Sequence, residues 1–84
     1  MDNIINIGQE IHRELIKQER TVAWLSRQLG TNRMACYRIF NCYSIDTSIL
    51  LSISKILKRD FFALYSDSIK SNIPSESDSK DIDV

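Results

Sequence analysis

A single glycine separates two short apolar patterns in the middle of this 84-residue chain. Before Gly30, apolar side chains recur at a spacing that places them on one face of a helix, at Val22, Leu25 and Leu29. After it, a second inward stripe consists of Ala35, Cys36, Ile39 and Phe40. Thr21 and Asn32 are residue types that cap helix starts, and glycine readily adopts the left-handed conformation that ends a helix. The sequence therefore predicts two short helices joined by a tight turn within residues 21–41.

The flanking segments predict further helices and no strands. A first helix is expected from Ile4 to about Gln18, only modestly weakened by Gly8, with an apolar stripe of Ile4, Ile7, Ile11, Leu15 and Ile16. A later helix, capped by Asp46 or Thr47, is expected to turn inward Ile49, Leu50, Ile53, Ile56 and Leu57. A short last helix after Asp60 would contain Phe61, Phe62, Leu64 and Tyr65. We therefore predict one compact, all-α domain of four to five helices over residues 1–65.

The carboxyl end has a different composition. From Asp67 onward the chain is rich in Ser and Asp, contains Pro74 and has only scattered apolar residues. Such a segment buries too little surface to offset the entropy of ordering it. A disordered acidic tail is therefore predicted over residues 66–84.

The formal net charge is zero, but the charges are unevenly distributed. Residues 1–65 carry nine Lys and Arg against six Asp and Glu, whereas residues 66–84 carry two against five. Between positions 20 and 41 every charged residue is an arginine, namely Arg20, Arg27, Arg33 and Arg38. This run indicates a local basic face, although an arginine-rich run by itself is also typical of an ordinary solvated surface.

The sequence offers little for catalysis, metal binding or membrane insertion. Cys36, Cys42 and His12 are too few for a four-ligand zinc site, and the two cysteines suggest reduced cytosolic thiols. No cluster of nucleophile, acid pair or phosphate loop accompanies His12, so a structural role is expected for it and neither an enzyme nor a cofactor is predicted. No apolar run in the sequence comes near the roughly 20 residues of a membrane span. These features favour a cytoplasmic binding module.

A helix-turn-helix explains the central segment best. This motif needs a first helix packed closely on a second, with a short turn between them, and Ser26 is small enough for a close approach. With its stretches IGQEIHRELIKQ, TVAWLSRQLGTNRMACYRIFN and IDTSILLSISKILKRDFFALY, the chain resembles the lambda-repressor-like, or XRE, family over residues 4–65. The family usually has alanine at Ser26 and valine or isoleucine at Thr31. The glycine that commonly follows its second helix is replaced by Cys42, so Asn41 is expected to take the left-handed turn.

This resemblance implies sequence-specific DNA binding, with residues 32–40 as a recognition helix in the major groove. It places against base edges Arg33, Met34, Tyr37 and Arg38, and against phosphates Thr21, Asn32 and Asn41. Arg20, Arg27 and Tyr43 are further phosphate candidates from their charge or position. The expected protein is a repressor-like transcriptional regulator that binds double-stranded DNA as a homodimer. The aromatic cluster at residues 61–65 is the candidate dimer surface.

Three alternatives stay open from the sequence alone, two for single residues and one for the whole domain. Met34 could fill a gap in the core, and Tyr37 could pack along the domain surface. Trp24 is expected to cover the seam against the first helix, Cys36 to be buried, and Cys42 to be the more reactive thiol. The whole domain could instead be a protein-interaction module, such as an antitoxin-like or adaptor subunit, a reading that the neutral net charge favours.

Overall fold

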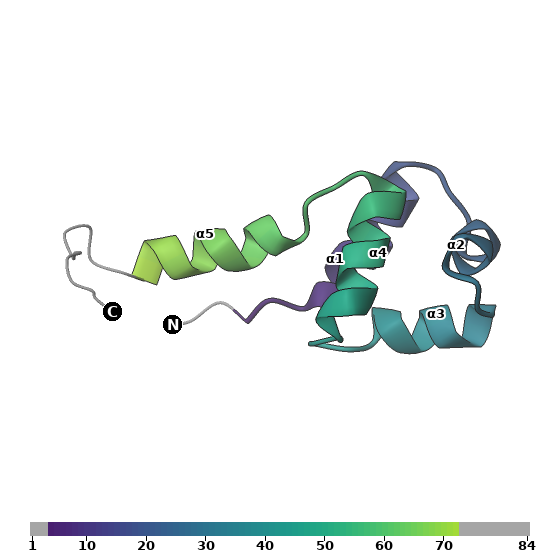
Figure 1. Cartoon of the computed structure of the whole chain (residues 1–84), viewed down its shortest axis with the longest axis horizontal. Helices are drawn as coiled ribbons and strands as arrows, with labels where there is room; N and C mark the ends of the chain where they lie inside the picture. Colours follow the sequence, from purple (N-terminus) through teal and green to yellow (C-terminus); the bar gives the residue numbers. More distant parts are fainter. Residues whose placement is uncertain (1–3, 73–84) are drawn as a thin grey trace.

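A computed structural model of the chain describes residues 4–72, which form five α-helices and contain no strand (Figure 1). The helices are α1 (Ile7–Lys17), α2 (Val22–Leu29), α3 (Arg33–Phe40), α4 (Thr47–Leu57) and α5 (Phe62–Asn72). The prediction of an all-α fold is confirmed. All five helices lie close to their predicted positions, and the differences concern where they begin and end.

The core forms where α1 and α4 pack together and the α2–α3 pair covers one side of them (Figure 1). Its buried side chains come from all four of these helices and from the segment before α5: Ile7, Ile11, Leu15, Leu25, Cys36, Phe40, Leu50, Ile53, Leu57 and Phe61. Burying large aliphatic and aromatic side chains is the dominant stabilising term for a domain of this size. The core therefore holds the α2–α3 pair at one end of the molecule.

The predicted caps of α2 and α3 are confirmed. Thr21 Oγ1 accepts a hydrogen bond from Trp24 N–H at 3.0 Å, and Asn32 Oδ1 accepts one from Ala35 N–H at 2.9 Å. Gly30 ends α2 in the left-handed region with φ of 72°. Each device satisfies helix-end groups that would otherwise lack a partner. The turn between the two helices is therefore built by the residues expected to build it.

The first helix begins later than predicted. Asn6 caps α1 by accepting a hydrogen bond from Gln9 N–H, so Ile4 lies before the helix and its side chain is 77% exposed. Ile16 is 61% exposed because the side chains at 7, 11 and 15 already form the buried stripe, and the next residue points about 100° away from it. Placing Ile4 and Ile16 in the core was wrong.

The chain leaves α3 without a left-handed residue. Asn41 has φ of −96° and ψ of 4°, so the expectation that it takes the left-handed turn was wrong. Cys42 N–H donates to Ile39 O at 3.0 Å, and Cys42 O accepts from Gly8 N–H at 3.0 Å. These two bonds hold the exit from α3 as a tightened right-handed turn.

The fourth and fifth helices also differ from prediction. Asp46 caps α4 as one of the two expected residues, but Ile49 is 39% exposed and lies at the edge of the core. The last helix runs from Phe62 to Asn72, so residues 66–72 are helical and the prediction of disorder there was wrong. No glycine or proline interrupts this stretch, and α5 ends two residues before Pro74, where proline disfavours a continuing helix. The remainder of the predicted tail lies outside the described residues.

The fifth helix gives the molecule an elongated outline of 47 × 28 × 20 Å (Figure 1). Its first turn packs on the core through Phe62, Leu64 and Tyr65, and its outer part projects away from the end that carries α2 and α3. Among residues 4–72, no helix is both long and apolar enough to cross a membrane.

Candidate nucleic-acid interface

The third helix turns four chemically varied side chains outward. Arg33, Met34, Tyr37 and Arg38 are all exposed, with Met34 at 67% and Tyr37 at 50%. These four residues, here called the α3 outer face, are those predicted to contact bases. Because Met34 is two-thirds exposed, the alternative that it fills a gap in the core is wrong.

The opposite side of α3 is firmly anchored. Cys36 is fully buried and Phe40 is 5% exposed. The His12 ring on α1 stacks on the Phe40 ring with 4.4 Å between centroids and 9° between planes, and Tyr37 meets the same ring edge-on at 5.9 Å. Aromatic pairs in these geometries add to the stability given by burial alone. His12 therefore has the structural role expected for it, and Tyr37 is held by its ring while half of it stays exposed.

Backbone hydrogen bonds close the turn between α2 and α3. Thr31 N–H donates to Ser26 O at 2.9 Å and Gly30 N–H to Arg27 O at 3.2 Å, which is the bonding of a left-handed helix end. Ser26 is buried against the helix pair, and its hydroxyl donates to Ala23 O at 2.8 Å. A small polar residue is thus accommodated between the helices with its hydroxyl satisfied.

Arg20 makes a contact that the sequence analysis did not foresee. Its guanidinium carbon lies 4.4 Å from the centroid of the Trp24 ring, while Trp24 itself packs against the core. An arginine held over an indole is restrained as well as stabilised. Their four-residue spacing within the sequence was the available signal for this pair.

The predicted phosphate contacts are all exposed, but some of their atoms are already bonded. These residues are Arg20, Thr21, Arg27, Asn32, Asn41 and Tyr43. The side-chain oxygens of Thr21 and Asn32 accept helix N–H groups, which leaves the Thr21 hydroxyl proton and the Asn32 amide protons for a ligand. Asn41 Nδ2 donates to Tyr37 O at 3.0 Å, so one of its two amide protons is also engaged.

The ion pairs of residues 4–72 lie away from these side chains. They join Arg13 to Glu10, and Arg59 to Glu10 and Glu14, at 3.1 to 3.8 Å. None of them involves the arginines at positions 20, 27, 33 and 38, and no acidic residue lies between those positions. Within residues 4–72, these four arginines therefore form no ion pair with a carboxylate.

A polar network instead joins the carboxyl ends of α1 and α4. Gln18 Nε2 donates to both Glu14 Oε2 and Leu57 O at 2.8 Å, and Arg59 Nη1 donates to Glu14 Oε1 at 3.2 Å. The hydrogen bond from Gln18 lowers the pKa of Glu14, with further lowering by the nearby positive charges of Lys17 and Arg59. This network stabilises the packing of α1 against α4 and does not involve the α3 outer face.

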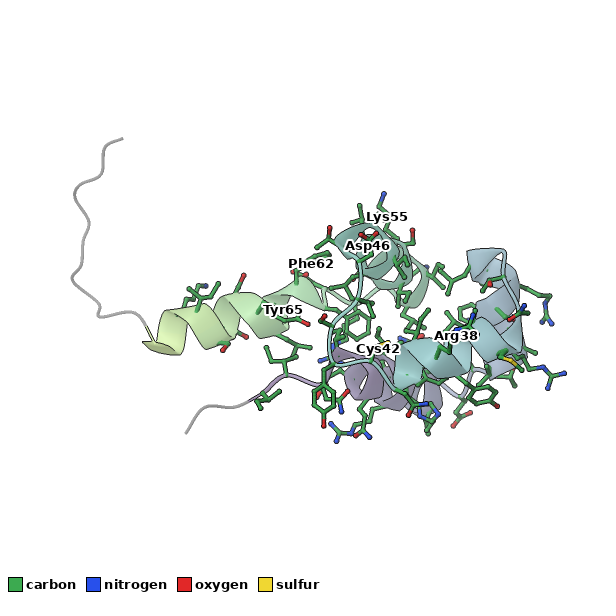
Figure 2. The ribbon with its side chains drawn as sticks, turned by 90° about the horizontal axis from the view of Figure 1, so that it is seen from below. Arg38, Cys42, Asp46, Lys55, Phe62 and Tyr65 are labelled. Atoms are coloured by element: carbon green, nitrogen blue, oxygen red, sulfur yellow. The ribbon has the colours of Figure 1, made fainter. Side chains whose placement is uncertain are left out.

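A second surface lies beside the base of α5. An apolar groove of about 270 Å³, here called the α5 groove, is lined by Ser44, Ile45, Thr47, Leu50, Phe62 and Tyr65. Figure 2 labels Phe62 and Tyr65 on α5, and Asp46, which precedes α4. Phe61 is fully buried in the core, so it cannot belong to the partner surface predicted at residues 61–65. The exposed apolar surface is instead formed by residues on both sides of it.

The two thiols differ in their surroundings. Cys36 and Cys42 are both free; the first is buried, and the second donates from Sγ to Arg38 O at 3.1 Å. Burial raises the pKa of the Cys36 thiol. Within residues 4–72, no group of three or more His, Cys, Asp or Glu side chains could hold a metal ion.

Comparisons of the chain with protein-family models, with curated proteins and with solved structures found no match. The functional argument therefore depends on the residues and the geometry described above.

Proposed function

We propose that this chain is a sequence-specific DNA-binding protein of the lambda-repressor-like type, acting as a repressor-like transcriptional regulator. The observation that carries the proposal is the α3 outer face: a methionine, a tyrosine and two arginines that form no ion pair within residues 4–72, presented by a helix anchored through its other side. A helix of this width fits the major groove of B-DNA.

Each side chain has a chemical task in this proposal. Arg33 and Arg38 would donate to guanine O6 and N7, a pairing worth about 1 to 3 kcal/mol of discrimination. Met34 would contact a thymine methyl group, and Tyr37 would offer a hydroxyl to base or backbone. Thr21 and Asn32 stand at helix amino termini, where N–H groups and the helix dipole favour phosphate. Arg20 and Arg27 would add affinity that does not depend on sequence.

A homodimer in the cytoplasm, binding two half-sites about 34 Å apart, completes the proposal. One small domain contacts few base pairs, so two copies related by a twofold axis would supply the affinity that one lacks. The α5 groove and the projecting helix beside it are the surface on which a second copy would pack.

The deciding experiment is selection of bound duplexes from a random library by the wild type and by Arg33→Ala and Arg38→Ala. We expect a short palindromic motif that loses preference at one position per half-site in each variant. Lys55→Ala, which changes an exposed residue of α4, is the matched control and should return the wild-type motif. Recovery of no motif by the folded wild type would refute base readout by α3.

A second candidate function is an adaptor or antitoxin-like interaction module. The α5 groove favours it, because an open apolar groove suits a protein partner. Binding to random duplex DNA at several salt concentrations separates the two functions. A protein that neutralises several phosphates must lose affinity steeply as salt rises, whereas an adaptor that binds no DNA gives no such curve.

A further inference from the structure

The backbone of Gly8 packs directly against the last turn of α3. A Cβ atom at this position would lie 2.3 Å from the carbonyl oxygen of Ile39 and 2.5 Å from that of Phe40. Both oxygens are backbone atoms, so no side-chain rotation could relieve the overlap. Glycine is the residue that lets α1 and α3 come this close.

Two further contacts reinforce this junction. Gly8 N–H donates to Cys42 O at 3.0 Å, which holds the chain just where it leaves α3. His12 lies one turn further along α1 and stacks on Phe40 at 4.4 Å. One face of α1 therefore contacts the end of α3 in two ways: through the backbone of Gly8, and through the His12 ring stacked on the buried Phe40 ring. The amino end of α1 also meets the carboxyl end of α3, where the partial charges of the two helices are opposite.

We infer that Gly8 is a positioning residue that sets the orientation in which α3 presents its outer face. The inference rests on the proposed DNA-binding function for its effect on base readout, and on the contacts above for the junction itself. Arg38 lies one residue before Ile39, so a displacement of the last turn moves a base-contacting side chain with it. Hydrogen bonds to base edges tolerate only a few tenths of an ångström, and these bonds carry the sequence information.

Disturbing this junction should therefore reduce the preference for the selected duplex while leaving binding to random duplexes largely unchanged. Gly8→Ala would push the last turn of α3 away from α1 and misalign the base contacts. Random-sequence binding depends on charge, which this substitution leaves unchanged. In an unobstructed helix the same substitution usually stabilises the protein, so a lower melting temperature would itself report the obstruction.

The test compares Gly8→Ala with Leu57→Ala, a core substitution at the far end of α4, where the wild-type side chain is 1% exposed. Affinity is measured for the selected duplex and for a random duplex at equal salt and at a temperature where both variants are folded. We expect Gly8→Ala to lower the ratio of selected to random affinity roughly tenfold or more. Leu57→Ala should keep that ratio while lowering the melting temperature. An unchanged ratio in folded Gly8→Ala would overturn the inference.

Two additions keep the test decisive. His12→Ala weakens the same junction without a clash, so it replaces Gly8→Ala if that variant does not fold, with the same expected fall in the ratio. NMR residual dipolar couplings measured without DNA give the angle between α1 and α3. We expect this angle to change in the junction variant and not in Leu57→Ala. If the angle between α1 and α3 changes but the wild type prefers no duplex, the role of Gly8 at the junction is supported and sequence-specific DNA binding is refuted. An unchanged angle would refute the role of Gly8 itself.

Discussion

The guanidinium carbon of Arg20 lies 4.4 Å from the centre of the Trp24 ring, at the amino end of α2. The stacking leaves the guanidinium N–H groups free to donate at its edge, beside the Thr21 cap. Such an arrangement favours a contact with a phosphate, which contributes affinity regardless of base sequence.

We therefore predict that Arg20→Ala weakens binding to all duplexes alike. Removing one phosphate contact should make the slope of log affinity against log salt less steep by about 0.9. Arg13→Ala is the matched control, since Arg13 is an exposed arginine on α1 that pairs with Glu10. A slope equal to that of the wild type in Arg20→Ala would exclude this contact.

Asn32 allows folding and DNA binding to be separated. Asn32→Asp keeps an oxygen that can accept Ala35 N–H and adds a negative charge that suits a helix amino terminus. The same charge would repel a phosphate. We predict an unchanged or slightly higher melting temperature together with DNA affinity at least about tenfold lower at low salt.

Asn32→Ala gives the complementary result. Loss of the cap should reduce stability by about 0.5 to 2 kcal/mol in urea unfolding, with no added repulsion. If Asn32→Asp binds DNA as well as the wild type does, the amino end of α3 does not face phosphate.

The pKa of Glu14 predicts how stability depends on pH. Its folded-state pKa is lowered from 4.5, first by the hydrogen bond from Gln18, so the unfolded state binds more protons as the pH falls. Stability from this group is fully present above the unfolded value and is lost as the pH falls through the lowered folded value. Urea unfolding between about pH 6 and pH 3 should show this loss, and Glu14→Gln should show a shallower one.

Some acid sensitivity should persist in that variant. The pKa of Asp46 is also lowered, because the Ser48 hydroxyl donates to its carboxylate at the start of α4. The informative quantity is thus the difference in slope between the two proteins. Equal slopes would mean that Glu14 is not held in its charged form by this network.

The helices α2 and α3 and the turn between them were predictable because their determinants are local. Each cap bonds within three residues, Gly30 needs no distant partner, and the apolar stripe of α3 follows from its spacing alone. The exposure of all four predicted base contacts follows from the same spacing. Local rules thus sufficed for the candidate interface.

The role of Gly8 was missed because it depends on a contact between segments far apart in the sequence. Gly8 seemed only to weaken a helix, because the carbonyl groups that exclude a side chain there come from residues 39 and 40. Neither composition nor periodicity encodes such proximity.

The two thiols should differ sharply in reactivity. The thiolate is the nucleophile, and burial both raises the pKa of Cys36 and blocks access to it. We predict that iodoacetamide at neutral pH modifies Cys42 alone in the folded protein and both residues in urea, as read by mass spectrometry. Modification of Cys36 at the same rate in the folded protein would show that α3 opens from the core readily.

The proposed homodimer would form through α5. Ile69 is 55% exposed and lies one turn beyond Tyr65, so that with Phe62 it continues an apolar stripe from the α5 groove onto the projecting part of the helix. A helix this short is only marginally stable alone in water, which favours a partner along its outer turns.

Ile69→Asp would bury a charge in such an interface and should weaken self-association by about tenfold or more in sedimentation experiments. Affinity for a palindromic duplex should fall with it, while affinity for a single half-site stays unchanged. Lys70→Ser, at the exposed neighbouring position, serves as the control. A wild type that sediments as a monomer at every concentration and still binds the palindrome without cooperativity would contradict pairing through α5.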